Sequence, residues 1–223
     1  MIPPNLSPIF YDPDAEVTIH LNVLPHWQQD GATYFITFRQ ADAIPAAKKI
    51  QWGNDRDCWM ISHPKPWTYE VEAEYHRLFS AIIERWLNAG MGSCVMRGPV
   101  CRSIVADALV FFDGQRCLHH AWVVMPNHVH TLTSIFPGWT LEKLLHSWKS
   151  FTAVQLNRQI SRTGEFWQED YYNRLVRDKP HFVRIMRYIE LNPLKAKLDE
   201  SEYTLYVNEL SRDYLANQAP PEA

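Results

Sequence analysis

The period of apolar and polar positions changes several times along the chain, and each change predicts an element. β-branched and aromatic residues fill 33–38 and predict a strand. From 69 to 88 the apolar residues recur at helical spacing, and Gly90 suits the end of that helix. Residues 99–112 predict a second helix. Because 40–67 holds three prolines and a glycine, we expect a long loop or small insertion there.

The second half of the chain predicts a hairpin and further helices. Residues 117–125 and 128–135 are expected to form antiparallel strands joined by a turn at Pro126-Asn127. Residues 141–160 predict an amphipathic helix with Thr140 as its N-cap. The remaining predicted elements are short extended pieces at 166–168 and 173–177 and a helix over 181–191 that ends near Asn192-Pro193. This order predicts an α+β fold, with helices packed on an antiparallel sheet and compatible with a ferredoxin-like split βαβ arrangement.

The same pattern divides the chain into three parts. Residues 1–30 are proline-rich and predict an irregular arm, 31–198 hold the predicted domain, and 199–223 form an acidic tail with a mobile tip. The four cysteines include no CxxC pair, so we interpret them as free thiols. With neither a signal peptide nor an apolar run of membrane-spanning length, the sequence predicts a cytoplasmic protein without a membrane partner.

A net charge of −3 for the whole chain disfavours a nucleic-acid partner, but the basic residues are concentrated in one segment. Residues 141–198 hold 11 Lys and Arg against 6 Asp and Glu, whereas 1–140 hold 10 against 13 and 199–223 hold 1 against 6. A local positive field of this kind can bind a phosphate backbone, although a solvated helix face with ordinary charges has the same composition.

Candidate chemistry is concentrated in the predicted hairpin and the last predicted helix. His128 and His130 are two apart in a strand, so both imidazoles face one side and can grip one divalent cation. Tyr188 lies in the helix with Asn192 four residues on, which puts both on one face. A phenol can attack a phosphodiester that a metal polarises, and the Asn192 oxygen could complete the metal site or fix the phenol. Packing histidines and a half-buried helical tyrosine are the alternative interpretation.

Basic and aromatic residues alternate between 148 and 177. The rings can stack on unpaired bases while the cations bind phosphates, although Trp148 and Phe151 are also at core spacing. The candidate DNA-binding residues are Lys149, Arg158, Arg174, Arg177, Arg184 and Lys195.

Taken in order, these blocks resemble the REP-associated tyrosine transposases, relatives of the small insertion-sequence transposases. The resemblance rests on Tyr34–Phe38, Ala121–His130, Lys149–Thr152, Phe166–Tyr172 with Arg177-Asp178, and Tyr188–Pro193, and covers about 32–39 and 100–198. Their HisUHis motif, in which U is a bulky apolar residue, is His128-Val129-His130 here.

The resemblance implies a ferredoxin-like HUH endonuclease fold and a set of roles. His128 and His130 would bind Mg²⁺ or Mn²⁺, and Tyr188 would attack the scissile phosphate to form a 5′-phosphotyrosine link and free a 3′-hydroxyl. The link conserves the phosphodiester energy, so no ATP motif is needed, and no GxxxxGK[ST] occurs. The implied substrates are single strands whose imperfect palindromes fold into hairpins, handled by a monomer or a homodimer.

The sequence departs from that family at three points. The arm and residues 40–67 are additions, Asn173 stands where many relatives have an acidic residue, and the total charge is acidic. Two alternatives stay open: a DNA-hairpin binding protein that does not cleave, and a metal hydrolase in which a carboxylate such as Glu190 joins His128 and His130.

Overall fold

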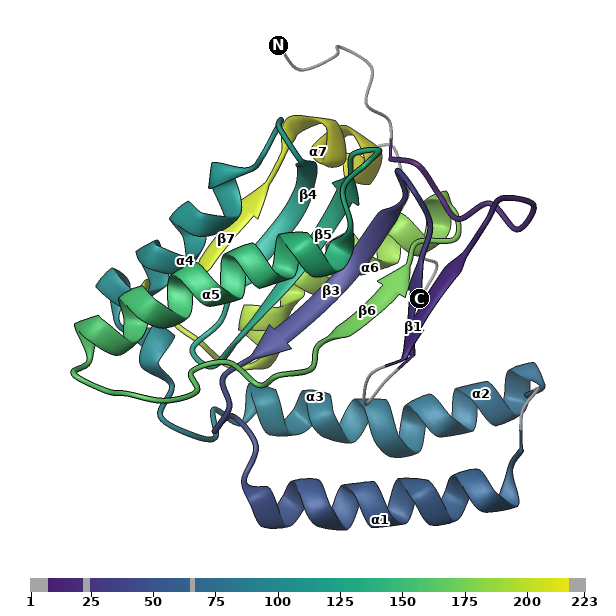
Figure 1. Cartoon of the computed structure of the whole chain (residues 1–223), viewed down its shortest axis with the longest axis horizontal. Helices are drawn as coiled ribbons and strands as arrows, with labels where there is room; N and C mark the ends of the chain where they lie inside the picture. Colours follow the sequence, from purple (N-terminus) through teal and green to yellow (C-terminus); the bar gives the residue numbers. More distant parts are fainter. Residues whose placement is uncertain (1–7, 22–24, 65–66, 217–223) are drawn as a thin grey trace.

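A five-stranded antiparallel sheet forms the centre of the molecule (Figure 1). The computed structural model describes residues 8–21, 25–64 and 67–216. In spatial order the strands are β6 (Tyr172–Leu175), β3 (Thr33–Arg39), β5 (His128–Ile135), β4 (Cys117–Val124) and β7 (Thr204–Val207). The predicted hairpin is therefore β4–β5, and it occupies the middle of the sheet.

Four of the strands and two helices follow the ferredoxin-like topology. The chain runs β3, α4 (Pro99–Phe111), β4, β5, α5 (Leu141–Gln159), β6, and these strands lie in the order β6-β3-β5-β4. This is the split βαβ arrangement with antiparallel neighbours. The predicted α+β fold, with helices packed on an antiparallel sheet, is confirmed.

Helices α4 and α5 cover one face of the sheet. Trp148 and Leu144 of α5 are almost fully buried against the strands, as their helical spacing predicted. The predicted N-cap is also present, because the Thr140 hydroxyl accepts a hydrogen bond from the backbone N–H of Lys143 at 3.3 Å.

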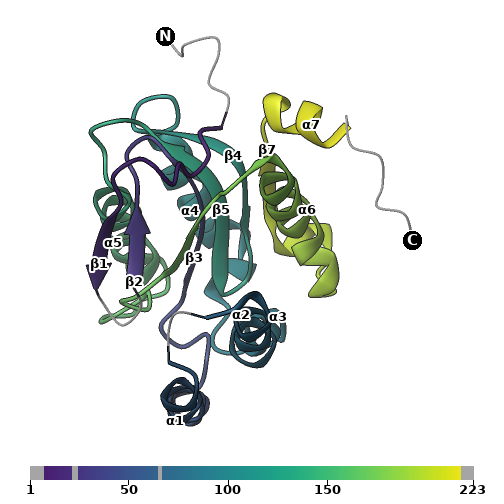
Figure 2. The ribbon, with the colours of Figure 1, turned by 90° about the vertical axis from the view of Figure 1, so that its right-hand side faces the viewer.

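Helix α6 (Lys179–Lys195) covers the opposite face, as Figure 2 shows. Its residues Phe182, Met186 and Ile189 are fully buried and pack on the strands. The predicted end near Asn192-Pro193 is wrong, because the helix continues to Lys195. Both of these residues are buried, and the backbone N–H groups of residues 196 and 198 pair with their carbonyls, so packing and the capping bonds outweigh the missing proline donor.

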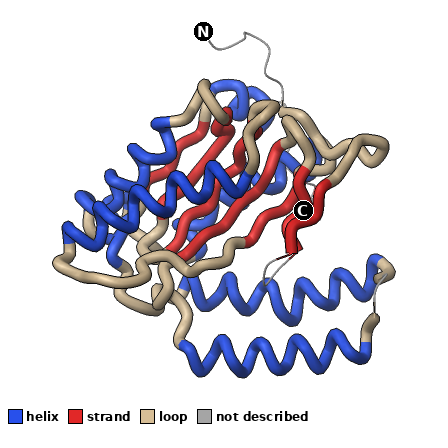
Figure 3. Tube along the Cα trace, viewed as in Figure 1, coloured by secondary structure: helices blue, strands red, loops and turns tan. Residues whose placement is uncertain are grey.

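The expectation of a loop over 40–67 is also wrong. Helix α1 (Ala46–Ser62) fills most of it and lies against a second rod made of α2 (Tyr69–Tyr75), a π-helical segment (His76–Ser80) and α3 (Ala81–Asn88) (Figure 3). The prolines at 45 and 64 flank α1 and do not interrupt it, which is why they do not prevent a helix. We call residues 46–88 the helical hairpin.

Aromatic rings hold the helical hairpin together. Trp59 packs on Tyr75 and Phe79 with ring centroids 5.6 and 5.7 Å apart, and the Trp52 indole donates to the backbone oxygen of Phe79 at 3.1 Å. These contacts explain why a segment with little buried aliphatic surface keeps a defined shape.

The two ends of the helical hairpin meet at its base. The backbone N–H of Ser93 donates to Asp42 Oδ2 at 2.9 Å. Gly92 has φ +82°, and a Cβ there would stand 2.5 Å from the backbone oxygen of Asp42. Only glycine allows this close approach, so the geometry of the base is set by a few residues.

Both ends of the chain add structure that the pattern did not predict. In the expected irregular arm, β1 (Thr18–Leu21) and β2 (Pro25–Gln28) form a two-stranded sheet. His26 binds Asp170 at 2.9 Å and Asn173 at 2.6 Å, which attaches this sheet to the body. In the expected tail, β7 pairs with β4 and is followed by α7 (Glu209–Ala216), whereas the tip lies outside the described residues. None of the helices in the described ranges is long and apolar enough to cross a membrane.

Candidate active site

His128 and His130 lie side by side on the sheet face that α6 covers. In β5 they stand opposite Arg39 and Thr37 of β3. Their Nε2 atoms are 3.1 Å apart, and both side chains are essentially fully buried. The predicted juxtaposition of the two imidazoles is therefore present.

Asn127 fixes the orientation of His128. Its Nδ2 donates to the backbone oxygens of Leu87 at 3.3 Å and Met91 at 2.9 Å, so its Oδ1 is the atom that meets His128 Nδ1 at 2.7 Å. An amide oxygen only accepts, which keeps the imidazole proton on Nδ1 and leaves the Nε2 lone pair free. The Thr37 hydroxyl lies 2.7 Å from Nδ1 of His130 and holds that ring in place, although a hydroxyl can donate or accept and so does not set the tautomer.

Burial keeps both imidazoles neutral. It lowers the pKa of His128 to about 3, with a smaller contribution from the Arg39 cation. It also lowers the pKa of His130 well below 6.5, and His128 adds to that effect. At neutral pH both rings therefore offer nitrogen lone pairs, which is the state that binds a metal ion.

Tyr188 points from α6 at the histidine pair. Its phenol oxygen is 3.3 Å from His130 Nε2, and its ring stands edge-on to His130 and to Phe35 of β3. Lys195, two turns along α6, places its ammonium 5.3 Å from the centre of the tyrosine ring. The phenol, the imidazoles and a cation thus meet at one point, which is what nucleophilic attack on a phosphate requires.

Asn192 lies one turn after Tyr188 and is fully buried. Its Nδ2 donates to Glu84 Oε1 at 3.0 Å, and its Oδ1 has no hydrogen-bond partner in the described part of the chain. No three His, Cys, Asp or Glu side chains among the described residues could hold a metal ion together. Two imidazole nitrogens with an amide oxygen are nonetheless donors that a divalent cation accepts, so the residues present fit such an ion if Asn192 contributes.

Glu84 is the site residue that sequence reasoning missed. It extends from α3, accepts a hydrogen bond from the Tyr188 hydroxyl, and lies 4.0 Å from His130 Nε2. Burial raises the pKa of Glu84, whereas Asn192 and Lys195 act in the opposite direction. The only signal in the sequence is a lone carboxylate between apolar pairs, Ile82-Ile83 and Trp86-Leu87.

Three of the predicted DNA-binding arginines gather near the tyrosine helix. Arg174 of β6 and Arg177 and Arg184 around the start of α6 all help burial to lower the pKa of His181, to about 4. Their charges therefore act on the imidazole of His181, which lies two helical turns, or about 10 Å along the axis, from Tyr188. Lys195 extends the positive charge on the other side of the phenol.

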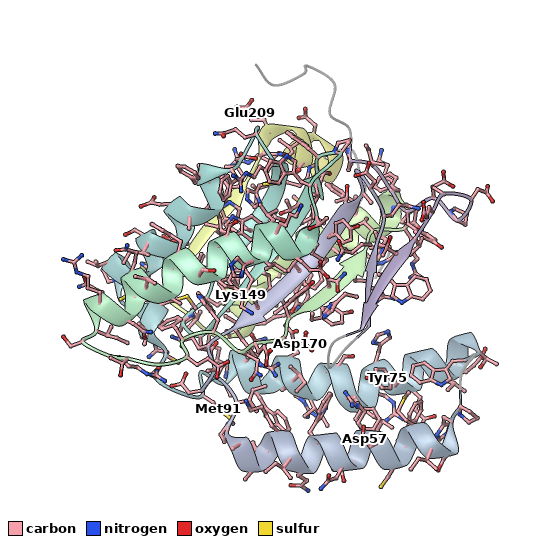
Figure 4. The ribbon with its side chains drawn as sticks, viewed as in Figure 1. Asp57, Tyr75, Met91, Lys149, Asp170 and Glu209 are labelled. Carbon is pink, nitrogen blue, oxygen red and sulfur yellow. The ribbon has the colours of Figure 1, made fainter. Side chains whose placement is uncertain are left out.

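The other two predicted DNA-binding residues are not brought to the tyrosine. Lys149 and Arg158 lie on α5, which covers the opposite face of the sheet. The Lys149 ammonium donates to the backbone oxygens of Gln168 and Glu169 at 2.8 and 2.6 Å, beside Asp170 in Figure 4, and so holds a loop. Glu190 is the carboxylate of the hydrolase alternative. Burial raises its pKa and the charges of Arg212 and Arg187 oppose that shift, whereas neither histidine of the pair contributes to it.

Part of the chain that includes the histidine pair and Tyr188 matches a known protein family. Residues 111–192 match the family model described as "Transposase IS200 like". This segment is similar to the IS200-like transposases. It contains both histidines, Tyr188 and Asn192 but not Glu84, and it confirms the resemblance found in the sequence.

The chain is similar to a REP-associated tyrosine transposase bound to a REP hairpin, with 14% identity, a TM-score of 0.42, and coverage of 78% of this chain and 74% of that one. No curated protein matches the sequence.

Proposed function

We propose that this chain is an IS200-like transposase that nicks and rejoins single-stranded, hairpin-forming DNA through Tyr188. The observation that carries the proposal is the phenol oxygen 3.3 Å from His130 Nε2, which is itself 3.1 Å from His128 Nε2. A nucleophile beside two neutral, buried nitrogen ligands is the arrangement that metal-assisted phosphoryl transfer needs.

In this proposal His128, His130 and the Asn192 oxygen hold the cation, Mg²⁺ or Mn²⁺. A cation bound there would supply polarisation of the scissile phosphate. Tyr188 Oη attacks the phosphorus, a new O–P bond forms, and the bond to the 3′-oxygen breaks. The phenol gives up its proton and the 3′-oxygen takes one from solvent, which leaves a 5′-phosphotyrosine and a free 3′-hydroxyl. A second 3′-hydroxyl reverses the step and rejoins a strand.

The charges around the site support a single-stranded substrate. Arg174 of β6, Arg177 and Arg184 act on His181 near the start of α6 and would provide phosphate contacts there. Phe35 and Tyr172, whose rings meet at 6.3 Å on adjacent strands, are half-buried and offer surfaces for unpaired bases. In a duplex the bases are stacked on one another and cannot reach such rings. Unpaired bases in the single strand next to a hairpin stem can stack on them.

The test is covalent capture with a phenol-specific variant. Purified protein is incubated with labelled single-stranded DNA from the flanks of its own gene and Mn²⁺, and run on a denaturing gel. We expect a protein-linked DNA band that EDTA abolishes and that Tyr188→Phe removes while DNA binding persists. Tyr206→Phe, which also removes a phenol but lies on β7 at the far edge of the sheet, is the matched control and should keep the band.

Two results would redirect the assignment. DNA binding without any adduct in the wild type would favour the non-cleaving hairpin-binding protein. Normal nicking by Tyr188→Phe would favour a hydrolase in which water is the nucleophile and the tyrosine is dispensable.

A further inference from the structure

One carboxylate oxygen of Glu84 joins the nucleophile to the proposed metal ligands. The Tyr188 hydroxyl and the Asn192 Nδ2 both donate to Oε1, and the same oxygen is 4.0 Å from His130 Nε2. Glu84 belongs to α3 of the helical hairpin, outside the segment that matches the family model. A residue from the helical hairpin therefore contacts the proposed nucleophile directly.

The bond to Glu84 decides how Asn192 is turned. Asn192 presents Nδ2 to Glu84 Oε1, which accepts the bond at 3.0 Å, and therefore directs Oδ1 elsewhere. That Oδ1 is buried and without a partner in the described part of the chain. A buried acceptor left unpaired costs about 1–3 kcal/mol unless something binds it, which suits an atom kept ready for a cation.

The helical turn that carries Glu84 is hydrogen-bonded both to Asn127, next to β5, and to helix α6. The backbone oxygens of Leu87 and Met91, which follow Glu84 at the end of the rod, accept the two hydrogen bonds of Asn127, the residue that orients His128. Figure 4 shows Met91 at the end of the rod near the sheet, by the base that Asp42 and Gly92 close. The segment 84–91 thus contacts the histidine strand and the tyrosine helix at the same time.

We propose that Glu84 is a positioning residue for the reaction assigned to Tyr188, and that the helical hairpin is consequently part of the active site. This inference rests on the proposed function and deepens it. Glu84 holds the phenol toward the histidine pair and fixes the Asn192 amide with its oxygen free. Groups that orient metal ligands in this way typically contribute 10- to 100-fold to metal affinity or activity.

The experiment compares Glu84→Ala and Glu84→Gln with Asp55→Asn, which removes an exposed charge from the same hairpin. Mn²⁺ affinity is measured by calorimetry on the protein without DNA, and adduct formation is measured in a single turnover with the hairpin DNA. For Glu84→Ala we expect about 10- to 100-fold weaker Mn²⁺ binding and slower adduct formation. Glu84→Gln should stay within about threefold of the wild type in both, because its amide oxygen can accept the same two bonds.

Either of two results would overturn the inference. The first is Mn²⁺ binding and adduct formation by Glu84→Ala at wild-type levels. The second is failure of Glu84→Gln as severe as that of Glu84→Ala, which would mean that charge rather than geometry matters. If thermal melting shows that Glu84→Ala does not fold, Glu84→Met fills the space without an acceptor and replaces it. A wild type that makes no adduct contradicts the proposed function, while the Mn²⁺ titration still tests Glu84.

Discussion

Asn127 is the residue whose replacement should separate the scaffold of the site from its chemistry. Asn127→Ala removes the acceptor of His128 Nδ1 and the two bonds to the backbone oxygens of Leu87 and Met91. The backbone oxygen of Leu87 still accepts a bond from the N–H of Gly90 at 3.1 Å, so it stays paired. The largest cost therefore comes from the Nδ1 proton of His128, which is buried and loses its acceptor. An unpaired buried donor costs about 1–3 kcal/mol and each lost neutral bond about 0.5–1.5 kcal/mol. With the two bonds to Leu87 and Met91 counted, we therefore expect the free energy of unfolding to fall by about 2–6 kcal/mol.

The matched variant is Asn127→Asp. It keeps an acceptor for His128 but sets an oxygen against the two carbonyls, so it should be destabilised and yet retain the tautomer of His128. Urea unfolding followed by circular dichroism measures stability, and calorimetry measures Mn²⁺ affinity. Asn127→Ala should lose Mn²⁺ affinity by about 10-fold or more, and Asn127→Asp should lose much less. Equal affinities for the two variants would refute the role assigned to the Asn127 oxygen.

Three further predictions follow from the packing. Burial lowers the pKa of His120 and of His128 to about 3, so as the pH falls these rings are protonated in the unfolded chain before they are in the folded one. The stability they contribute should be complete above pH 6.5, and the free energy of unfolding should fall by about 1.4 kcal/mol per pH unit for each histidine between pH 6.5 and 3. His120→Asn should reduce the slope of unfolding free energy against pH by one proton. Gly92→Ala should lower the melting temperature and slow adduct formation, because its Cβ would collide with the Asp42 backbone and displace the end of α3; wild-type values of both would contradict this account of the base. Asp178→Ala removes the N-cap of α6, where the carboxylate accepts from the N–H of His181 at 2.6 Å, and should cost about 1 kcal/mol in urea unfolding without abolishing the adduct.

The sequence predicted what depends on short-range periodicity. Strand β5 and helices α4 and α5 lie within a residue of their predicted bounds, since each has a clear period and a turn or cap at its ends. The pairing of His128 with His130 follows from strand geometry alone. Tyr188 was placed near them by resemblance, because no local rule indicates that α6 packs on the histidine face.

What the sequence could not predict depends on tertiary contacts. Helix α1 was missed because prolines were counted over the whole of 40–67, although they flank the helix and leave its interior free. Glu84 is 44 residues from His128 and more than 100 from Tyr188, so only the folding of the helical hairpin brings it to the site. Strand β7 was missed because its four residues carry no alternation strong enough to distinguish them from an acidic tail.

The closed base of the helical hairpin has a consequence for how such a protein can change. Asp42 and Ser93, 51 positions apart in the chain, are in hydrogen-bond contact, so the segment between them leaves and re-enters the body at one place. A segment with adjoining ends can be gained, lost or exchanged without altering strand order or connectivity. The sheet therefore places little constraint on the length of the helical hairpin. Its last turn is constrained strongly, because Glu84 and the backbone oxygens that bind Asn127 must keep their positions. Variation in length should be tolerated at the far end of the hairpin, around residues 62–68, and selected against in its last turn.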